Sequence, residues 1–252
     1  MRSFPVASAS AVVRQAQADA DTAARASGVR VRELVHAAEH HAAEQVLSRV
    51  WSTPLHQAPL PVHVTRTVSA IGGYVAAAYD SGGELLGAAA GFLTGDTAEL
   101  GPAHLHSHIA GVSPAARGRH VGFALKLHQR AWALARGIDR ITWTFDPLVA
   151  RNAYFNLTKL GARATRYLPD FYGDMADGIN AGQGSDRLLA DWELASAVVA
   201  AAIREHRVSP DPGDPPPGRL LVLRPDDLGA PLHTPPLSTA PPPRTPPLDA
   251  PL

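Results

Sequence analysis

The 252-residue sequence contains no cysteine, which excludes disulfides, thiolate metal ligands and a cysteine nucleophile. It also has no net charge, because 23 Lys and Arg residues balance 23 Asp and Glu residues. Proteins that bind nucleic acid or anionic membranes usually carry a broad positive field, so we expect neither kind of partner. The absence of thiols suits a reducing compartment, and we expect a cytoplasmic protein.

Long apolar runs are also missing. No stretch approaches the ~20 consecutive apolar residues of a membrane-spanning helix. The first residues carry one Arg and a weak apolar run that Pro5 and serines interrupt, so we expect no signal peptide. Two common phosphate-binding motifs, G-x-x-x-x-G-K-[ST] and G-x-G-x-x-G, are absent as well. Any phosphate-binding turn in this chain must therefore be of another kind.

The composition predicts one domain with two extensions. Hydrophobic residues make up 45% of the chain, enough for one substantial core. Fifteen of the 23 prolines lie from Pro210 onward, which argues against a second core there. We therefore expect a helical or disordered extension over residues 1–28, a single domain over residues 29–208, and a Pro-rich, mostly disordered tail over residues 209–252.

Hydrophobic periodicity and turn residues predict alternating strands and helices. Strands are expected at 29–35, 72–80, 85–93, 105–112, 141–145, 164–167, 188–192 and 219–223. Helices are expected at 37–51, 118–136, 150–160 and 196–206, and a loop at 54–61. On the first helix, His40 and His41 are expected to face solvent. This order predicts an α/β protein with a mixed sheet and helices on both faces.

The junction between the strand at 105–112 and the next helix has features of an anion site. Arg119, Gly122 and Ala124 stand there in the order R-x-x-G-x-A. The first backbone N–H groups of a helix have no intrahelical acceptor, and the helix dipole adds about half a positive charge at that end. Small residues leave these groups uncovered, and Arg117 and Arg119 add formal charge. We therefore expect this turn to bind an anion such as a pyrophosphate.

At these residues the sequence resembles the GNAT superfamily of acyl-CoA-dependent N-acyltransferases. The signature of that superfamily, [QR]-x-x-G-x-[GA], follows a V-x-P-x-x-R-G sequence, and both are present from Val112 to Ala124. A further likeness, covering about residues 29–194, is to a poorly characterised branch of predicted GNAT acyltransferases. It rests on the segments SHIAGV, ALKLHQRAWAL, GIDRITWTFDPLVARNAYFNLTKLGA, YGDMADGIN and SDRLLADWEL.

The resemblance implies a largely antiparallel GNAT sheet whose strands splay apart at an acyl-CoA site, with acetyl-CoA or another acyl-CoA as co-substrate and no metal. The strand residues expected to bond the pantetheine arm are Ile109, Ala110, Gly111 and Val112. The turn residues expected to hold the pyrophosphate, through the N–H groups from Arg119 to Ala124 and the two arginines, are Arg117, Gly118, Arg119, His120, Val121, Gly122, Phe123 and Ala124. A backbone N–H at Gly111 or Ile109 would polarise the thioester oxygen.

Asn152 and Asn156 lie one turn apart on the predicted helix and should share a face. By the same resemblance they are candidates for the cofactor site. Asn156 either bonds the pantetheine amides or caps local backbone.

Acyl transfer to an amine requires a base, and three histidines alternate along the strand before the turn. His104, His106 and His108 should point to one face. His108 is the first choice for the base and His106 the second, because His108 lies nearest the expected splay. Alternatively, these histidines are hydrogen-bonded structural residues. Three ligands on one strand would not converge on one tetrahedral ion, so we expect no zinc site.

The proton donor departs from the superfamily pattern, since Leu157 stands where many GNAT enzymes have a tyrosine. Tyr154 or Tyr172 could replace it, or water could serve. Asp146, at the end of a strand, either orients a cationic amine or makes an ordinary turn before Pro147. Asp186 and Arg187 line the acceptor pocket or form an internal ion pair.

Together these features predict an enzyme that moves an acetyl or other short acyl group from acyl-CoA to the amine of a small molecule. Direct transfer in a ternary complex is expected, because no cysteine could carry the acyl group. A homodimer is left open. The alternatives are a non-catalytic acyl-CoA-binding regulatory module, which Leu157 favours, and a zinc hydrolase that uses the three histidines.

Overall fold

The computed structural model describes residues 6–96, 101–173, 185–206, 223–225 and 231–233. The chain divides into two units, Met1–Pro210 and Asp211–Leu252. In the second unit, β8 (Leu223–Pro225) pairs with β9 (Pro231–His233) in antiparallel fashion. The rest of the predicted tail, and most of the strand predicted at 219–223, lie outside the described residues.

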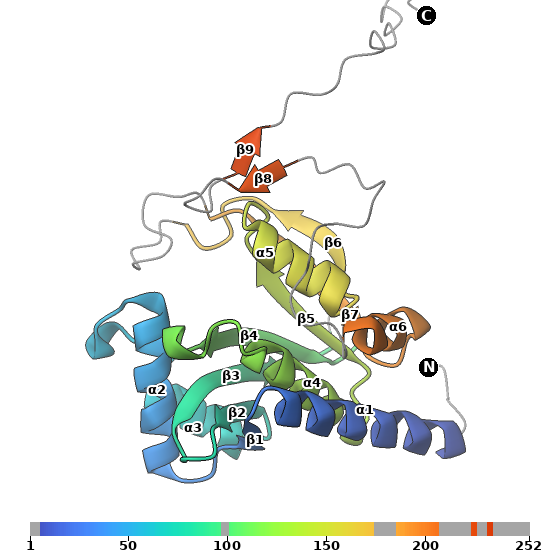
Figure 1. Cartoon of the computed structure of the whole chain (residues 1–252), viewed down its shortest axis with the longest axis horizontal. Helices are drawn as coiled ribbons and strands as arrows, with labels where there is room; N and C mark the ends of the chain where they lie inside the picture. The colour runs from blue at the N-terminus through green and yellow to red at the C-terminus, as the bar shows by residue number, and fades with distance from the viewer. Residues whose placement is uncertain (1–5, 97–100, 174–184, 207–222, 226–230, 234–252) are drawn as a thin grey trace, which may run out of the picture. The chain divides into compact units, whose positions relative to one another are not determined.

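A seven-stranded sheet forms the centre of the first unit (Figure 1). Its strands, in spatial order, are β1 (Arg30–Glu33), β2 (Tyr74–Tyr79), β3 (Leu85–Leu93), β4 (Leu105–Val112), β5 (Arg140–Phe145), β7 (Arg187–Glu193) and β6 (Arg163–Leu168). All neighbours are antiparallel except β4 and β5. The predicted mixed, largely antiparallel α/β fold is confirmed.

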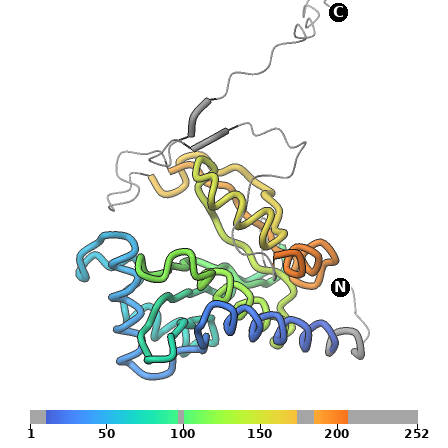
Figure 2. Tube along the Cα trace, in the orientation of Figure 1, coloured from blue at the N-terminus to red at the C-terminus, as the bar shows by residue number. Residues whose placement is uncertain are grey.

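Helices cover both faces of the sheet, as the path of the chain in Figure 2 also shows. On one face lie α2 (Ala37–Trp51) and α3 (Val62–Ala70). On the other lie α1 (Val6–Ala26), α4 (Val121–Ala135), α5 (Ala150–Ala153), which continues as the wider π-helical segment η3 (Tyr154–Lys159), and α6 (Ala197–His206). No helix in the described ranges is long and apolar enough to cross a membrane.

Two helical elements were not predicted from the sequence. Residues 54–61, predicted as a loop, contain the short 3₁₀ turn η1 (Leu55–Gln57), and α3 follows directly. Helix α3 buries only Thr65 and Val68, so its apolar stripe is too short to stand out in the sequence. The expectation that His40 faces solvent was also wrong. It is 1% exposed, and its Nδ1 lies 2.9 Å from Thr65 Oγ1, which links α2 to α3.

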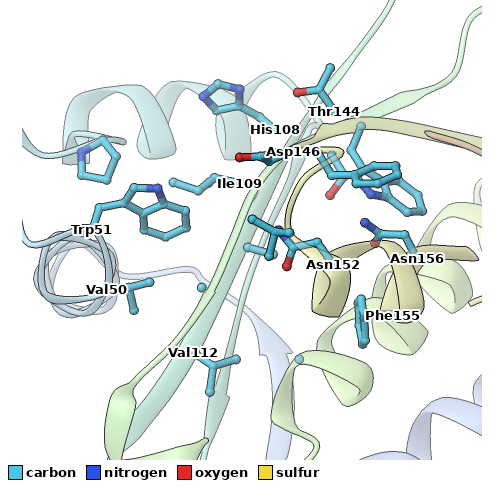
Figure 3. A pocket seen from close by; sticks show the side chains of 18 of the residues that line it. Val50, Trp51, His108, Ile109, Val112, Thr144, Asp146, Asn152, Phe155 and Asn156 are labelled. Atoms are coloured by element: carbon cyan, nitrogen blue, oxygen red, sulfur yellow. The ribbon is translucent and has the colours of Figure 1, made fainter. Parts of the chain in front are cut away.

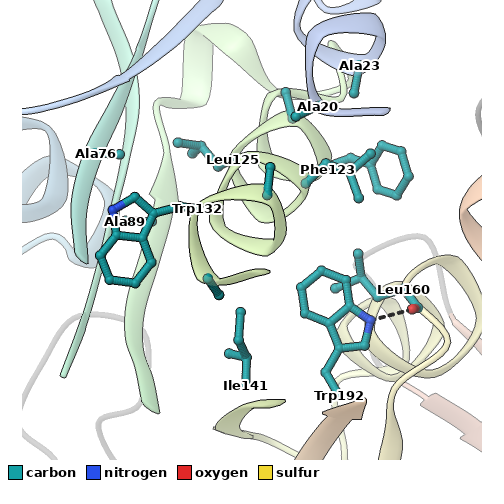
Figure 4. Packing of buried hydrophobic residues seen from close by; sticks show 14 of the residues in the cluster. Ala20, Ala23, Ala76, Ala89, Phe123, Leu125, Trp132, Ile141, Leu160 and Trp192 are labelled. Atoms are coloured by element: carbon teal, nitrogen blue, oxygen red, sulfur yellow. Dashed lines mark hydrogen bonds between the residues drawn. The ribbon is translucent and has the colours of Figure 1, made fainter. Parts of the chain in front are cut away.

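The core below the parallel strands is built around Trp192 of β7 (Figure 4). Its ring meets Trp143 of β5 edge-on at 5.8 Å between centroids. Its indole N–H donates to the carbonyl of Leu160, 2.7 Å away, at the end of η3. A buried indole needs such a partner, so this bond fixes η3 relative to β5 and β7. The positions of η3 and β5 are thereby fixed by the packed core around Trp192.

The N-terminal segment is part of this core. Helix α1 is one of the two states predicted for residues 1–28, and it packs Ala16, Ala20 and Ala23 against α4. Asp19 Oδ2 and Arg130 Nη1 form an ion pair at 3.2 Å, with both side chains less than 5% exposed. The sequence contained no signal for this docking, because the alanine face of α1 is only weakly apolar. The boundary placed at residue 29 stays a prediction.

Strands β4 and β5 are paired only briefly. Their register joins Leu105 to Ile141 and His106 to Thr142, and no later pair is formed among the described residues. Beyond this point the edge of β4 that faces β5, from Ser107 to Val112, has no strand partner in the described part of the chain. A bulge between Ser107 and Ile109, opposite Ala90 and Gly91, bends β4 at the same place. The sheet therefore opens where β4 leads into α4.

Asp19→Ala should lower the free energy of unfolding by about 3 kcal/mol, because it leaves the buried Arg130 guanidinium without its carboxylate. Urea denaturation measures this. Asp21→Ala is the matched control on the exposed face of α1, where Asp21 only accepts a bond from Gln17, and should change stability by less than about 0.5 kcal/mol. Equal losses in both variants would contradict the role of α1 in the core.

Candidate functional site

A cavity of about 910 Å³ lies where β4 and β5 part. Figure 3 shows Val50 and Trp51 of α2 on one side of it, and Asn152, Phe155 and Asn156 on the other. Strands β4 and β5 run between these helices, and Gly122 of α4 also belongs to the lining. The cavity therefore extends from the first turn of α4 along the free edge of β4.

All four strand residues predicted for the pantetheine site line the cavity: Ile109, Ala110, Gly111 and Val112. Gly111 is required by packing, since a Cβ there would lie 2.7 Å from Trp51 Cζ3 and 3.1 Å from Leu47 Cδ2. A side chain at this position would push α2 away from the strand. The glycine thus lets α2 close one wall of the cavity against β4.

The turn before α4 leaves backbone donors free, although fewer than predicted. Helix α4 begins at Val121 rather than 118, because His120 adopts a left-handed conformation with φ 59°. The N–H of Arg119 bonds to the Ala116 carbonyl, and those of Phe123 and Ala124 both bond to the His120 carbonyl. Within the described residues, the N–H groups of Gly118, His120, Val121 and Gly122 have no acceptor. These four can bind an anion.

The side chains of the turn divide into three groups. Arg117 and Gly122 line the cavity. Gly118, His120 and Arg119 are exposed outside the lining, and the Arg119 guanidinium extends toward Gly28. Val121, Phe123 and Ala124 are buried in the core. The positive charge that this turn presents to the cavity therefore comes from Arg117 and the helix end, not from Arg119.

Both asparagines reach the cavity. Asn156, in η3, is 5% exposed, and neither its amide nor that of Asn152 has a hydrogen-bond partner among the described residues. The capping role considered for the Asn156 side chain is thus not observed. A π-helical turn widens the backbone and is often found at functional sites. Two unused amides point into the space beside β4.

His104 and His106 are held by a relay of hydrogen bonds through Thr142. His104 Nδ1 lies 2.9 Å from the Pro102 carbonyl, which can only accept, so Nδ1 carries the proton. Its Nε2 then accepts from Thr142 Oγ1 at 3.0 Å, and the same oxygen accepts from His106 Nδ1 at 3.0 Å. Burial, with neighbouring His108, His104 and Lys126, lowers the pKa of His106 to about 4. His106 is neutral and lies outside the cavity lining.

His108 lies at the cavity itself. Its ring meets Phe92 edge-on at 5.3 Å, and its nitrogens have no hydrogen-bond partner within the described ranges. Burial lowers its pKa below the ordinary histidine value, so the imidazole is neutral at pH 7. The described residues contain no group of three potential metal ligands, the three histidines included.

Figure 3 shows Thr144 and Asp146 at the same end of the cavity as His108. One carboxylate oxygen of Asp146 accepts a hydrogen bond from the Leu148 N–H at 2.8 Å, so the turn predicted at this residue is present. Asp146 also lines the cavity. Tyr172 also lines the cavity, and its hydroxyl lies 3.0 Å from Thr144 Oγ1.

Other predicted residues lie elsewhere. Tyr154 is outside the lining, and its ring packs against His206 and Lys159. Leu157 is also outside the lining and is 38% exposed. Arg187 lines the cavity and Asp186 does not.

The lining residues that were not identified from the sequence include Trp51, Ser107, Lys126 and Trp143. Lys126 is 6% exposed, and its Nζ donates to Ser107 Oγ at 2.8 Å and lies 3.9 Å from the Trp143 ring centroid. Burial lowers its pKa to about 7. The available signal was a lone lysine in the otherwise apolar first half of α4.

Comparison with known proteins relates part of this chain to a known family and its fold to solved structures. Residues 54–161 match the model of the acetyltransferase (GNAT) family. No curated protein sequence matches significantly. Among solved structures, the ribosomal-protein-S18-alanine N-acetyltransferase of Escherichia coli is 13% identical, with a TM-score of 0.53 over 67% of this chain and 96% of that one.

Two further structures resemble the fold to a similar degree. The yncA protein of Salmonella typhimurium, determined with acetyl-CoA, is 15% identical, with a TM-score of 0.51 over 66% of this chain and 94% of that one. Aminoglycoside 6'-acetyltransferase type Ii is 17% identical, with a TM-score of 0.50 over 66% of this chain and 97% of that one. At these identities the likeness shows the fold. The family match identifies a GNAT acetyltransferase domain in residues 54–161, which include the R-x-x-G-x-A turn.

Proposed function

We propose that the enzyme transfers a short acyl group from acyl-CoA directly to the amine of a small molecule, within a ternary complex. The observation that carries this proposal is one continuous cavity that joins the bare first turn of α4, the free edge of β4 and His108. A donor with a charged diphosphate, an extended amide-containing arm and a reactive end would match these three parts in that order.

The donor would bind mainly through backbone. The diphosphate would accept the N–H groups at His120, Val121 and Gly122, with Arg117 as counter-charge. The amides of the pantetheine arm would lie along β4 from Ile109 to Val112 as an added strand does. Asn152 and Asn156 have free amides on the opposite side of that arm.

The chemical step would use His108 as the base. The neutral imidazole first takes a proton from the cationic amine, and the nitrogen, now neutral, attacks the thioester carbon. The carbon–sulfur bond then breaks, and the second proton that the nitrogen loses passes to the thiolate through Tyr172 or water. A backbone N–H at Gly111 or Ile109 would stabilise the oxyanion, and Asp146 would orient the incoming amine while it is still cationic. His106, outside the lining, would support the strand, and Tyr154 is too poorly placed to be the acid.

The acceptor side of the cavity supports a small amine. Trp51 and Tyr172 line the same cavity as His108, so large aromatic side chains occupy part of its wall. The structural neighbours include a ribosomal-protein-S18-alanine N-acetyltransferase and an aminoglycoside 6'-acetyltransferase, so the fold alone does not identify the acceptor of this chain. A cytoplasmic location and a homodimer stay predictions.

Gly122→Glu should abolish CoA binding, measured by calorimetry, because its carboxylate and bulk would stand against the diphosphate. An acidic residue in the first turn favours the helix dipole, so the loss would not come from unfolding. Gly122→Ala is the control, since its Cβ would make an ordinary 3.6 Å contact with Val112 Cγ2. Unchanged affinity in the Glu variant would count against the placement of the diphosphate.

His108→Gln should lower kcat by about 10²- to 10⁴-fold and leave the Kd of acetyl-CoA unchanged. Because burial lowers the His108 pKa, the acid limb of wild-type kcat/KM should lie below pH 6.5, and the variant should lose that limb. His63→Gln, exposed on α3, should behave as wild type. An acid limb that persists in the Gln variant would assign the base elsewhere.

Turnover itself can be tested without knowing the acceptor. Thiol release from acetyl-CoA with a panel of small primary amines, measured beside calorimetric CoA binding, separates an enzyme from a binding module. Release with at least one amine is expected. Tight binding with no release under any amine would contradict the proposed small-molecule acceptor.

A further inference from the structure

Lys126 lies at the point where β4 and β5 separate. It follows Gly122 by one helical turn, so both residues face the cavity from the same side of α4. Its two strand contacts, Ser107 and Trp143, each come directly after the last β4–β5 pair, His106 with Thr142. The ammonium therefore lies at the closed end of the cavity, beyond the stretch of β4 proposed to hold the pantetheine arm.

Within the described part of the chain, this ammonium contacts only neutral groups. Besides Ser107 and the face of Trp143, Nζ donates to Gln129 Oε1 at 3.3 Å. Among the residues that the structure describes, no Asp or Glu lies within ion-pair distance of it. A buried cation without a counter-charge is costly, and the pKa of about 7 reflects that cost.

The use of lysine rather than arginine at position 126 also favours an anion as the missing partner. The sequence uses lysine only at positions 126 and 159, and arginine at every other basic position. An ammonium is a compact point charge on a flexible stem, suited to a monodentate contact with a small anion. A residue needed only to fill space between Ser107 and Trp143 would be apolar.

The face on which Lys126 lies separates it from the acceptor. Successive strand residues point to opposite faces, so Ser107 and Trp143 face α4, and the side chains of His106 and Thr142 face away from it. His108, across the bulge, packs against Phe92, which belongs to the core on the α2 face. An amine that His108 deprotonates approaches from the α2 face. The tail of the acyl group, attached to the same carbonyl carbon, then extends toward α4.

We propose that Lys126 binds a carboxylate at the far end of the acyl group, so that the preferred donor is the CoA thioester of a short dicarboxylic acid, such as malonyl- or succinyl-CoA. The acyl carboxylate supplies the counter-charge that the ammonium lacks. This inference rests on the proposed function and specifies its donor. Transfer then gives an N-acyl product with a free terminal carboxylate.

Calorimetric binding to the full chain tests the donor without an acceptor. Succinyl-CoA is compared with butyryl-CoA, and malonyl-CoA with propionyl-CoA, because each pair matches in chain length and differs in the carboxylate. Wild type should bind at least one dicarboxylic thioester about 10- to 100-fold more tightly than its neutral partner, as a charge-assisted contact in a buried site provides. Lys126→Met should bring that ratio to about one, and Lys159→Met, of equal charge change outside the cavity, should keep it.

A second readout follows the proton. The pKa of about 7 leaves the Lys126 amine largely neutral at pH 8. Binding of a carboxylate beside it should make the amine take up a proton, so the binding of succinyl-CoA should be accompanied by the uptake of as much as about one proton. The binding of butyryl-CoA should be accompanied by no proton uptake, and the uptake with succinyl-CoA should vanish in Lys126→Met. Calorimetry in buffers of different ionisation enthalpy measures this. A role for Lys126 in packing alone would produce no such uptake.

The binding measurements distinguish a failure of the Lys126 inference from a failure of the proposed function. If CoA and acetyl-CoA bind but neither dicarboxylic thioester binds more tightly than its neutral partner, the inference is wrong and the proposed function stands. If no CoA compound binds, the proposed function itself is wrong. If Lys126→Met leaves the thioester ratios intact and instead raises the KM of an acidic amine, the ammonium serves the acceptor and the inference is overturned.

Discussion

The site depends on one constraint, which is that β4 and β5 are parallel neighbours joined by only two residue pairs. Parallel strands need a crossover, and α4 supplies it, so the first turn of a helix is delivered to the mouth of the gap between them. The bulge near His108 and the missing side chain at Gly111 shape the same gap. The first turn of α4 with Arg117, the extended backbone of β4 and the neutral imidazole of His108 therefore line one cavity.

Burial decides the charge state of the groups around this gap. His106 and His108 lose part of their basicity because their imidazolium forms would be poorly solvated, so both are neutral at pH 7. The same cause acts on Lys126 from the α4 face. One face of the gap therefore presents the neutral imidazole of His108, and the other the amine of Lys126, which has no counter-charge among the described residues. This asymmetry is the basis for placing the amine on one side and the acyl tail on the other.

Much of the fold was predictable because its signals are local. Strand β4 and helix α2 have the bounds that their patterns predicted, and the R-x-x-G-x-A turn was correctly placed between strand and helix. What the sequence could not show depends on tertiary packing. The docking of α1 rests on alanines and the Asp19–Arg130 pair, and the start of α4 shifted because His120 takes a left-handed conformation. Lys126 was missed because its one local signal, a lone lysine among apolar residues of α4, does not show that the ammonium is buried against Ser107 and Trp143.

A crystal structure of the full chain with bound CoA tests the central claim most directly. The account predicts diphosphate oxygens about 3 Å from the backbone nitrogens of Val121 and Gly122, with the pantetheine arm beside β4 from Ile109 to Val112 and its thiol at the level of His108. CoA bound outside the gap between β4 and β5, or a diphosphate held by another element, would contradict it.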